Sequence, residues 1–513
     1  MVTLPLPTRR ETALAVALIV SFAFLWNVDL AYDEQHALGV KLVPSDHGWP
    51  FLASQNHSAG PAVKLPTVDE ALVKWSSSLD IPQTKYLAGS TGWSMLDSVI
   101  VMNGTIFIIT DKPESFPEVR MLISSGIKIM RGEDEILRQE PTSKDMQIIS
   151  SARALELIGT SASRVEGVTW LCNDAPQYLS HYYHFIAEIT LGFWRTYSTL
   201  DPNISSSGLT TLPAPRRLVL PHTLSTEWRD YSRLSTYITS AVFPSLAFEF
   251  AETWTDRAEM ARPFIYDRLL IADRAAAMRS PHWPVAYRMI TPVFEIPSGS
   301  EYWWAPVRRN LLSFLRHHDS MLELESELDG GGAAQAGVIP VKPVITYVSR
   351  QGWGRRMLRE ADHQVLVRAL ERLRDTYGYE LNIVSMDTMS REDQLILAAR
   401  TTIMLGVHGN GLTHALWMNP SPRTALLEFF FPEGFTHDYE YPTRVLGIAY
   451  YCWWGDRYFD RGKLPIPNEP EGFQGNEIPL DGERVARLVH ELITGVHDDR
   501  PVLPPRPRLS SEE

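Results

Sequence analysis

The chain has 513 residues, with 48 Lys or Arg, 61 Asp or Glu and a formal net charge of −13. This length predicts two domains with connecting segments rather than one core. The negative charge argues against a nucleic-acid-binding protein, because a polyanion would need a local basic patch and the sequence has none. The 44% of apolar residues excludes a mainly disordered chain, and two cysteines exclude a disulfide scaffold.

An apolar segment near the N-terminus predicts a membrane anchor. Residues 12–28 follow Arg9 and Arg10, and their only polar members are Thr12, Ser21 and Asn27. About 17 residues is the short end of a spanning helix. The preceding arginines predict a cytoplasmic tail at 1–11 and a lumenal remainder. A cleavable signal peptide is the alternative, although no small-x-small cleavage site follows the run.

Residues 29–75 are rich in Pro, Ser, Gly and His, which predicts a stem between the membrane and a folded body. Asn56, Asn103 and Asn203 each begin an Asn-x-Ser/Thr acceptor for N-glycosylation, which is used only in the secretory lumen. Cys172 and Cys452 leave two possibilities open, a disulfide or two buried thiols.

The folded body is predicted to contain two domains. In the first, residues 76–325, strands at 98–102 and 106–109 flank Asn103-Gly104, a strong hairpin signal, and further strands are expected at 217–220 and 269–272. A glycine-rich linker is predicted at 326–340, a second domain at 341–497 and a disordered tail at 498–513.

The second domain alternates strands and helices. Strands are predicted at 344–348, 381–384, 402–407 and 426–430. A helix ending at Gly378, a helix beginning at Ser390 and a short helix at 412–418 connect them. This alternation predicts a parallel sheet with right-handed crossovers, in which ligands bind at the carboxyl ends of the strands.

The loop from His408 to Gly411 is the first candidate site. Its glycines allow a close backbone approach, and the helix that follows offers free N–H groups, which together suit a phosphate. A plain tight turn is the alternative. Arg350 directly follows the neighbouring strand, and Arg355 and Arg356 come soon after, so forked cationic donors for a diphosphate are at hand. A solvated helix start explains at least one of that pair equally well.

These segments resemble the successive motifs of glycosyltransferase family 61. The resemblance is carried by residues 181–188, 347–350, 355–356, 389–394, 406–414 and 427–428. It covers about residues 165–460. Asn410 departs from the pattern, because the family usually has Ala there.

The resemblance implies an α/β, GT-B-like fold with two Rossmann-type domains. It also implies a UDP-sugar as donor substrate, no cofactor, inversion at the anomeric carbon, and transfer in the secretory pathway. With the anchor, we expect a single-pass type II protein of the Golgi or endoplasmic reticulum membrane that transfers GlcNAc or xylose to a protein or glycan hydroxyl. We expect the donor to contact Arg350, Arg355, Arg356, His408, Gly409, Asn410, Gly411, Leu412 and Thr413, and its ribose to contact Glu428.

His181, His184 and Glu188 would share one face of a helix. We expect His184 to be the catalytic base and Glu188 to orient it, and the reverse assignment is the alternative. His181 is explained equally well by packing against its aromatic neighbours. A metal site is the third interpretation, but we expect no metal, because the family fold normally carries its donor without a cation.

The sequence also allows three other interpretations of its residues and function. Asp438 and Glu440 resemble the metal-binding acidic pair of other glycosyltransferases, although an ordinary polar loop explains them better. A lumenal binding protein that kept the fold without turnover is the rival function. A Rossmann oxidoreductase is disfavoured, because no acidic residue stands at the expected strand end to bind ribose, Glu428 being the nearest.

Overall fold

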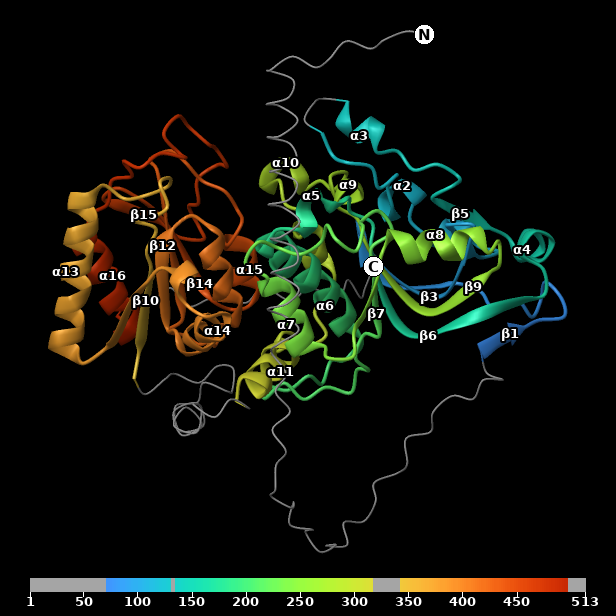
Figure 1. Ribbon diagram of the computed structural model, residues 1–513, viewed down its shortest axis with the longest axis horizontal. Coiled ribbons are helices and arrows are strands. Elements are labelled where there is room, and N and C mark those ends of the chain that lie inside the picture. The colour runs from blue at the N-terminus through green and yellow to red at the C-terminus, as the bar shows by residue number, and fades with distance from the viewer. Residues whose placement is uncertain (1–70, 131–133, 317–341, 497–513) are drawn as a thin grey trace, which may run out of the picture. The chain divides into compact units, whose positions relative to one another are not determined.

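The computed structural model describes residues 71–130, 134–316 and 342–496 (Figure 1). Below, residues 71–316 are called the N-terminal half and residues 342–496 the C-terminal half. The predicted cytoplasmic tail, anchor, linker, C-terminal tail and nearly all of the stem lie outside the described residues. No helix within the described ranges combines the length and apolarity needed to span a bilayer.

The N-terminal half is built on a mixed sheet. Its strand order is β5 (Met146–Ile149), β4 (Thr105–Ile109), β3 (Trp93–Met102), β9 (Phe264–Ala272), β6 (Ser161–Cys172), β7 (Arg217–Val219) and β8 (Ala247–Glu249). Two further strands pair with it: β1 (Leu72–Lys74), within the range predicted as stem, with β6, and β2 (Lys85–Ser90) with β3. The strands β9, β6, β7 and β8 are parallel. In chain order they read 4-1-2-3, the arrangement at the centre of a Rossmann sheet, so the strand order reverses between β6 and β9.

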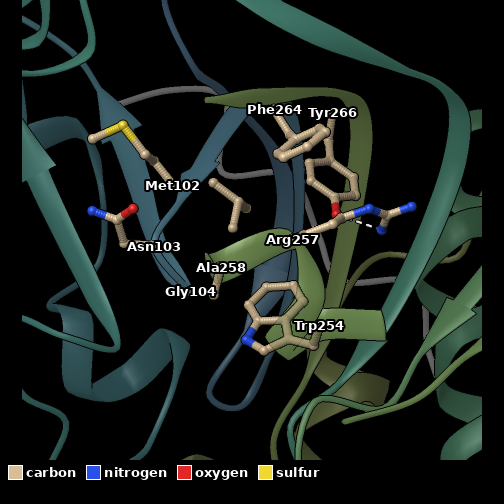
Figure 2. Close-up of a pocket in the computed structure, with 9 residues that line it drawn as sticks. Met102, Asn103, Gly104, Trp254, Arg257, Ala258, Phe264 and Tyr266 are labelled. Atoms are coloured by element: carbon tan, nitrogen blue, oxygen red, sulfur yellow. Dashed lines mark hydrogen bonds between the residues drawn. The ribbon is translucent and has the colours of Figure 1, made fainter. Parts of the chain in front are cut away.

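The predicted hairpin is confirmed. Strands β3 and β4 pair with Met102 opposite Thr105, and Asn103 and Gly104 have φ values of 54° and 78°. Both turn residues adopt the left-handed conformation that a two-residue hairpin turn requires. A small apolar pocket lies between the hairpin and α8 (Ala251–Glu259), and the side chain of Asn103 points away from it (Figure 2). Arg257 beside this pocket is already paired with Glu249.

The C-terminal half contains the predicted parallel sheet. Its order is β11 (Glu380–Val384), β10 (Val344–Val348), β12 (Ile403–Val407), β13 (Ala425–Phe430), β14 (Ala449–Trp454) and β15 (Arg457–Phe459). Only the last pairing in this described sheet, β14 with β15, is antiparallel. The order reverses between β10 and β12, which is where such sheets bind ligands.

The helices of this half begin and end at the expected signals. Helix α13 (Glu360–Tyr377) stops at Gly378, whose φ is 72°, and α14 (Arg391–Arg400) starts after Ser390, whose side chain accepts a hydrogen bond from the backbone N–H of Asp393. Figure 1 shows α13 beside α16 (Gly482–Thr494), and both pack on the sheet through Leu366, Leu370 and Val489.

Short helices connect the remaining elements. They are α2 (Val119–Leu122), α3 (Glu135–Arg138), α4 (Ser151–Ile158), α5 (Pro176–Leu179), α6 (Leu191–Tyr197), α7 (Leu234–Val242), α9 (Arg274–Ala277), α10 (Trp283–Ala286), α11 (Ala305–Leu315) and α15 (Glu440–Val445). A π-helix covers His184–Thr190, and 3-10 helices cover Pro113–Ser115, Ser198–Leu200, Thr291–Glu295, Met386–Thr388 and Asn410–Trp417.

One hydrophobic core extends through both halves. It includes Trp93 of the first sheet and Leu426 of the second. Hydrogen bonds cross the same region: the Trp304 indole N–H donates to the carbonyl of Leu416, and the Trp417 indole N–H donates to the Tyr182 hydroxyl. The two sheets therefore belong to one compact unit with a fixed relation between their edges. Cys172 and Cys452 lie in this core as buried free thiols, so they do not form the disulfide that the sequence left open.

Candidate functional site

The strand-order reversal in the C-terminal half brings together two of the predicted segments. Arg350 lies just beyond β10 and the loop His408–Gly409 just beyond its parallel neighbour β12. The guanidinium of Arg350 lies over Gly409, so closely that a Cβ atom at position 409 would stand 2.3 Å from Nη1. Position 409 therefore has no room for a side chain while Arg350 keeps this conformation.

The arginines beside this loop make no direct contact with a described counter-charge, although Asp438 and Glu469 act on Arg356 from a distance. Neither Arg350 nor Arg356 forms an ion pair with a described residue, and the Nε atom of each is buried without a hydrogen-bond partner. Burial, reinforced by the charge of Arg356, lowers the pKa of Arg350 to about 10, and burial lowers the pKa of Arg356 as well. The neighbouring Arg355 is exposed to solvent. Such a group is prepared for an anion, because a bound diphosphate would supply the missing negative charge.

His408 is held by carboxylates on both sides of its ring. Its Nδ1 lies 2.6 Å from Glu428 Oε1 and its Nε2 lies 3.5 Å from Asp438 Oδ2. Glu428 is wholly buried, and its second oxygen accepts a hydrogen bond of 2.5 Å from the Tyr450 hydroxyl. The structure therefore places Glu428 behind His408, where it orients the ring. Glu428 is not exposed in this structure, and its expected contact with the donor ribose stays a prediction.

The rest of the loop is held by contacts with neighbouring elements. The side-chain oxygen of Asn410 accepts a hydrogen bond from the backbone N–H of Tyr183 at 3.2 Å, which joins the loop to the N-terminal half. A Cβ atom at Gly411 would approach Val348 Cγ1 to 3.0 Å, so this position packs tightly on β10. Leu412 and Thr413 are fully buried and hold the loop from behind.

The predicted pair of His184 and Glu188 is in contact. His184 Nδ1 lies 2.6 Å from Glu188 Oε2, and both residues belong to a π-helix. The His184 side chain is 25% exposed and that of Glu188 is 0% exposed, so only the histidine is open to a ligand. Burial alone would raise the pKa of Glu188, but the charges of Arg274 and His184 outweigh it and lower the pKa to about 2. Glu188 is therefore a buried carboxylate that holds the ring of His184.

His181 lies beside His184, and the acidic residues Asp438 and Glu440 each contact a basic side chain. His181 is exposed, with its ring centroid 5.1 Å from that of His184. Asp438 accepts a 2.5 Å hydrogen bond from Arg288, and Glu440 contacts His437 at 2.9 Å. Within residues 71–130, 134–316 and 342–496, no three His, Cys, Asp or Glu side chains are grouped so that they could hold a metal ion.

Several charged residues that complete the site were not predicted from the sequence. Arg274 follows β9 and Asp174 follows β6, the two strands between which the order of the first sheet reverses. Arg288 connects the halves through its ion pair with Asp438. The strand before Arg274 was predicted, so the position of Arg274 at a strand end could have been inferred from the sequence. Strand β6 was not predicted, and therefore the strand-order reversal between β6 and β9 could not be inferred.

Comparison with known proteins agrees with this geometry. Residues 182–426 match the family model described as Glycosyltransferase 61, a range that contains the His184–Glu188 pair, Arg350 and the 408–413 loop. The EGF domain-specific O-linked N-acetylglucosamine transferase of Drosophila melanogaster is 29% identical over 120 residues, which are 22% of this chain and 21% of that protein. The chain thus matches about a fifth of the length of this curated relative. By this match, residues 182–426 of this chain resemble a glycosyltransferase family 61 domain.

Proposed function

We propose that the protein is an inverting glycosyltransferase of the secretory pathway that moves a sugar, GlcNAc or xylose, from a UDP-sugar to a protein or glycan hydroxyl. The observation that carries this proposal is the pair of Arg350, which lies over Gly409, and Arg356, each with a buried Nε atom that has no hydrogen-bond partner, at the strand-order reversal of a parallel sheet. Two sheets that each reverse order beside the site support a GT-B-like arrangement.

On the donor side, the arginines would bind the diphosphate and offset the charge that grows on UDP as the sugar leaves. Cationic donors fixed before the reaction stabilise such charge without reorganisation, which is the role that other glycosyltransferases give to a metal ion. His408, fixed between Glu428 and Asp438, lies at the same strand end.

On the acceptor side, His184 would act as the base. Its Nδ1 is engaged by Glu188, which leaves Nε2 to accept a proton. In a single displacement, the acceptor oxygen bonds to the anomeric carbon, the bond from that carbon to UDP breaks, and the acceptor proton passes to His184. The contact between Tyr183 and Asn410 keeps this base next to the donor loop.

The direct test is a screen of UDP-sugars against the purified lumenal part. One UDP-sugar should raise the melting temperature saturably and be transferred, or slowly hydrolysed, and EDTA should not abolish this activity, because arginines replace the metal. Stabilisation by UDP with no turnover of any UDP-sugar would favour the lumenal binding protein instead. Loss of activity in EDTA that a metal restores would contradict the metal-free mechanism.

The proposed location in the endoplasmic reticulum or Golgi membrane has its own test. Asn103, at the tip of the β3–β4 hairpin, and Asn203 both have exposed side chains, so glycans would fit on the folded surface at either position. Glycosidase treatment of the protein from a eukaryotic host should lower its apparent mass, and Asn103→Gln and Asn203→Gln should each remove part of that shift. An unchanged mass would contradict the lumenal topology.

A further inference from the structure

A buried charged network lies beneath His184. Strands β6 and β9 are parallel neighbours with Cys172 opposite Ala272, so residues two positions beyond each end meet. These residues are Asp174 and Arg274. The backbone N–H of Arg274 donates to Asp174 Oδ1 at 2.8 Å, and Nε donates to Oδ2 at 3.0 Å. The topology of the sheet thus anchors a cation at its carboxyl edge.

The same cation contacts the partner of the proposed base. Arg274 Nη1 donates to Glu188 Oε2 at 2.7 Å, and this oxygen also lies 2.6 Å from His184 Nδ1. The guanidinium carbon of Arg274 stands 4.0 Å from the centre of the Tyr178 ring. The centre of the same ring lies 5.1 Å from that of the His184 ring, in a T-shaped arrangement. Arg274 and Glu188 are 3% and 0% exposed, so solvent screens their interaction little.

We propose that Arg274, anchored by Asp174, is a positioning residue that keeps Glu188 a carboxylate and so turns His184 with its Nδ1–H towards Glu188 and its Nε2 towards the acceptor. The inference deepens the proposed function and rests on it for the role of His184.

The position of one proton decides which tautomer His184 adopts. A carboxyl group buried without a cation tends to hold its proton, because burial disfavours the charged form. A protonated Glu188 would donate to His184 Nδ1, which would leave the hydrogen of the neutral ring on Nε2. That tautomer cannot accept the acceptor proton. The charge of Arg274 prevents this outcome, which agrees with the lowered pKa of Glu188.

The sign of the expected pH effect is fixed by the charge. Removing a positive charge strengthens proton binding by the His184–Glu188 pair, so the pair releases its proton at higher pH. Other titratable or charged groups face the pair from each packed element and stay unchanged in such a variant: Tyr178, His181, Tyr183, Asp174, Arg288 and Asp438.

The experiment compares Arg274→Met and Arg274→Lys with a matched control. The control is Arg268→Met, which removes a forked ion pair with Asp97 from the same strand β9. Two quantities are followed against pH: kcat at saturating UDP-sugar, and the reaction of His184 with diethyl pyrocarbonate, measured by peptide mass spectrometry. The reagent attacks only the neutral ring, so the second measurement does not depend on catalysis.

In Arg274→Met, we expect the midpoint of both profiles to rise by about one pH unit, which lowers kcat about tenfold at pH values well below the parent midpoint. UDP affinity should stay close to that of the parent. Arg274→Lys retains the charge and should keep both midpoints close to those of the parent, whereas Arg268→Met should lower the melting temperature without moving either midpoint. Glu188→Gln removes the opposite charge and should move the His184 midpoint to lower pH.

Unmoved midpoints in Arg274→Met, with a stability loss like that of the control, would overturn the proposal and make Arg274 purely structural. If Arg274→Met fails to fold, the shift in Glu188→Gln decides, and its absence would overturn the proposal. If the parent protein turns over no UDP-sugar but the His184 midpoint still shifts in Arg274→Met, the result would support the network and contradict the proposed function.

Discussion

Replacing His184 by Ala lowers turnover by about two to four orders of magnitude and leaves UDP affinity almost unchanged, if His184 is the base. The reason is geometric. His184 stands on the N-terminal half with a quarter of its side chain exposed, while the proposed diphosphate ligands stand on the C-terminal half. Loss of the ring removes proton transfer in the transition state but no contact with UDP. Single-turnover rates and calorimetric titration with UDP measure the two quantities separately.

A matched control is His282→Ala. His282 also contacts a glutamate, Glu295, but that pair is exposed on the surface of the N-terminal half, so turnover should not change. A fall in UDP affinity in step with the rate of His184→Ala would refute the division of labour. The π-helix at 184–190 would then be structural or part of the donor site.

Replacing Arg350 by Ala is expected to weaken UDP binding and to slow transfer, at a cost of roughly 2–4 kcal/mol in the transition state. The departing UDP loses a cation that carries no internal counter-charge. Gly409→Val should also weaken UDP binding and slow transfer, because a side chain at position 409 collides with Arg350 Nη1. The values of kcat/KM and of the UDP dissociation constant report both effects.

Arg359→Ala is the matched control for this second prediction. Arg359 lies in the same connection as Arg350, but its side chain is 53% exposed and its nearest acid, Glu477, is 3.8 Å away. Such a surface pair contributes little, so UDP binding should be retained. If Arg350→Ala bound UDP and turned over like the parent, the donor site would lie elsewhere.

The C-terminal half was predictable because its signals are local. The strand at 344–348 is a short apolar run with the observed bounds, and Ser390 and Gly378 mark helix ends by their own chemistry. In such a sheet, strands connected by helices run parallel, so the position of the 408–411 loop at a strand end followed from the sequence.

The N-terminal half depends on distant pairings that no local signal reports. Strand β6 lies beside β9, about a hundred residues later, and the central strand β3 runs antiparallel to its neighbours β4 and β9. The site residues that depend on this order, Asp174 and Arg274, were accordingly missed. The His184–Glu188 contact was predictable, because side chains four residues apart are neighbours in the observed π-helix as well as in an α-helix.

The core that runs through both halves limits how this molecule acquires new specificity. Trp304 and Arg308 of the N-terminal half donate hydrogen bonds to the carbonyls of Leu416 and Trp417, directly behind the donor loop. A C-terminal half taken from another transferase would meet these donors with a foreign surface and leave them buried and unsatisfied. Exchange of whole halves is therefore a poor route to a new donor or acceptor, and variation has to act through the loops at the two sheet edges, one side chain at a time.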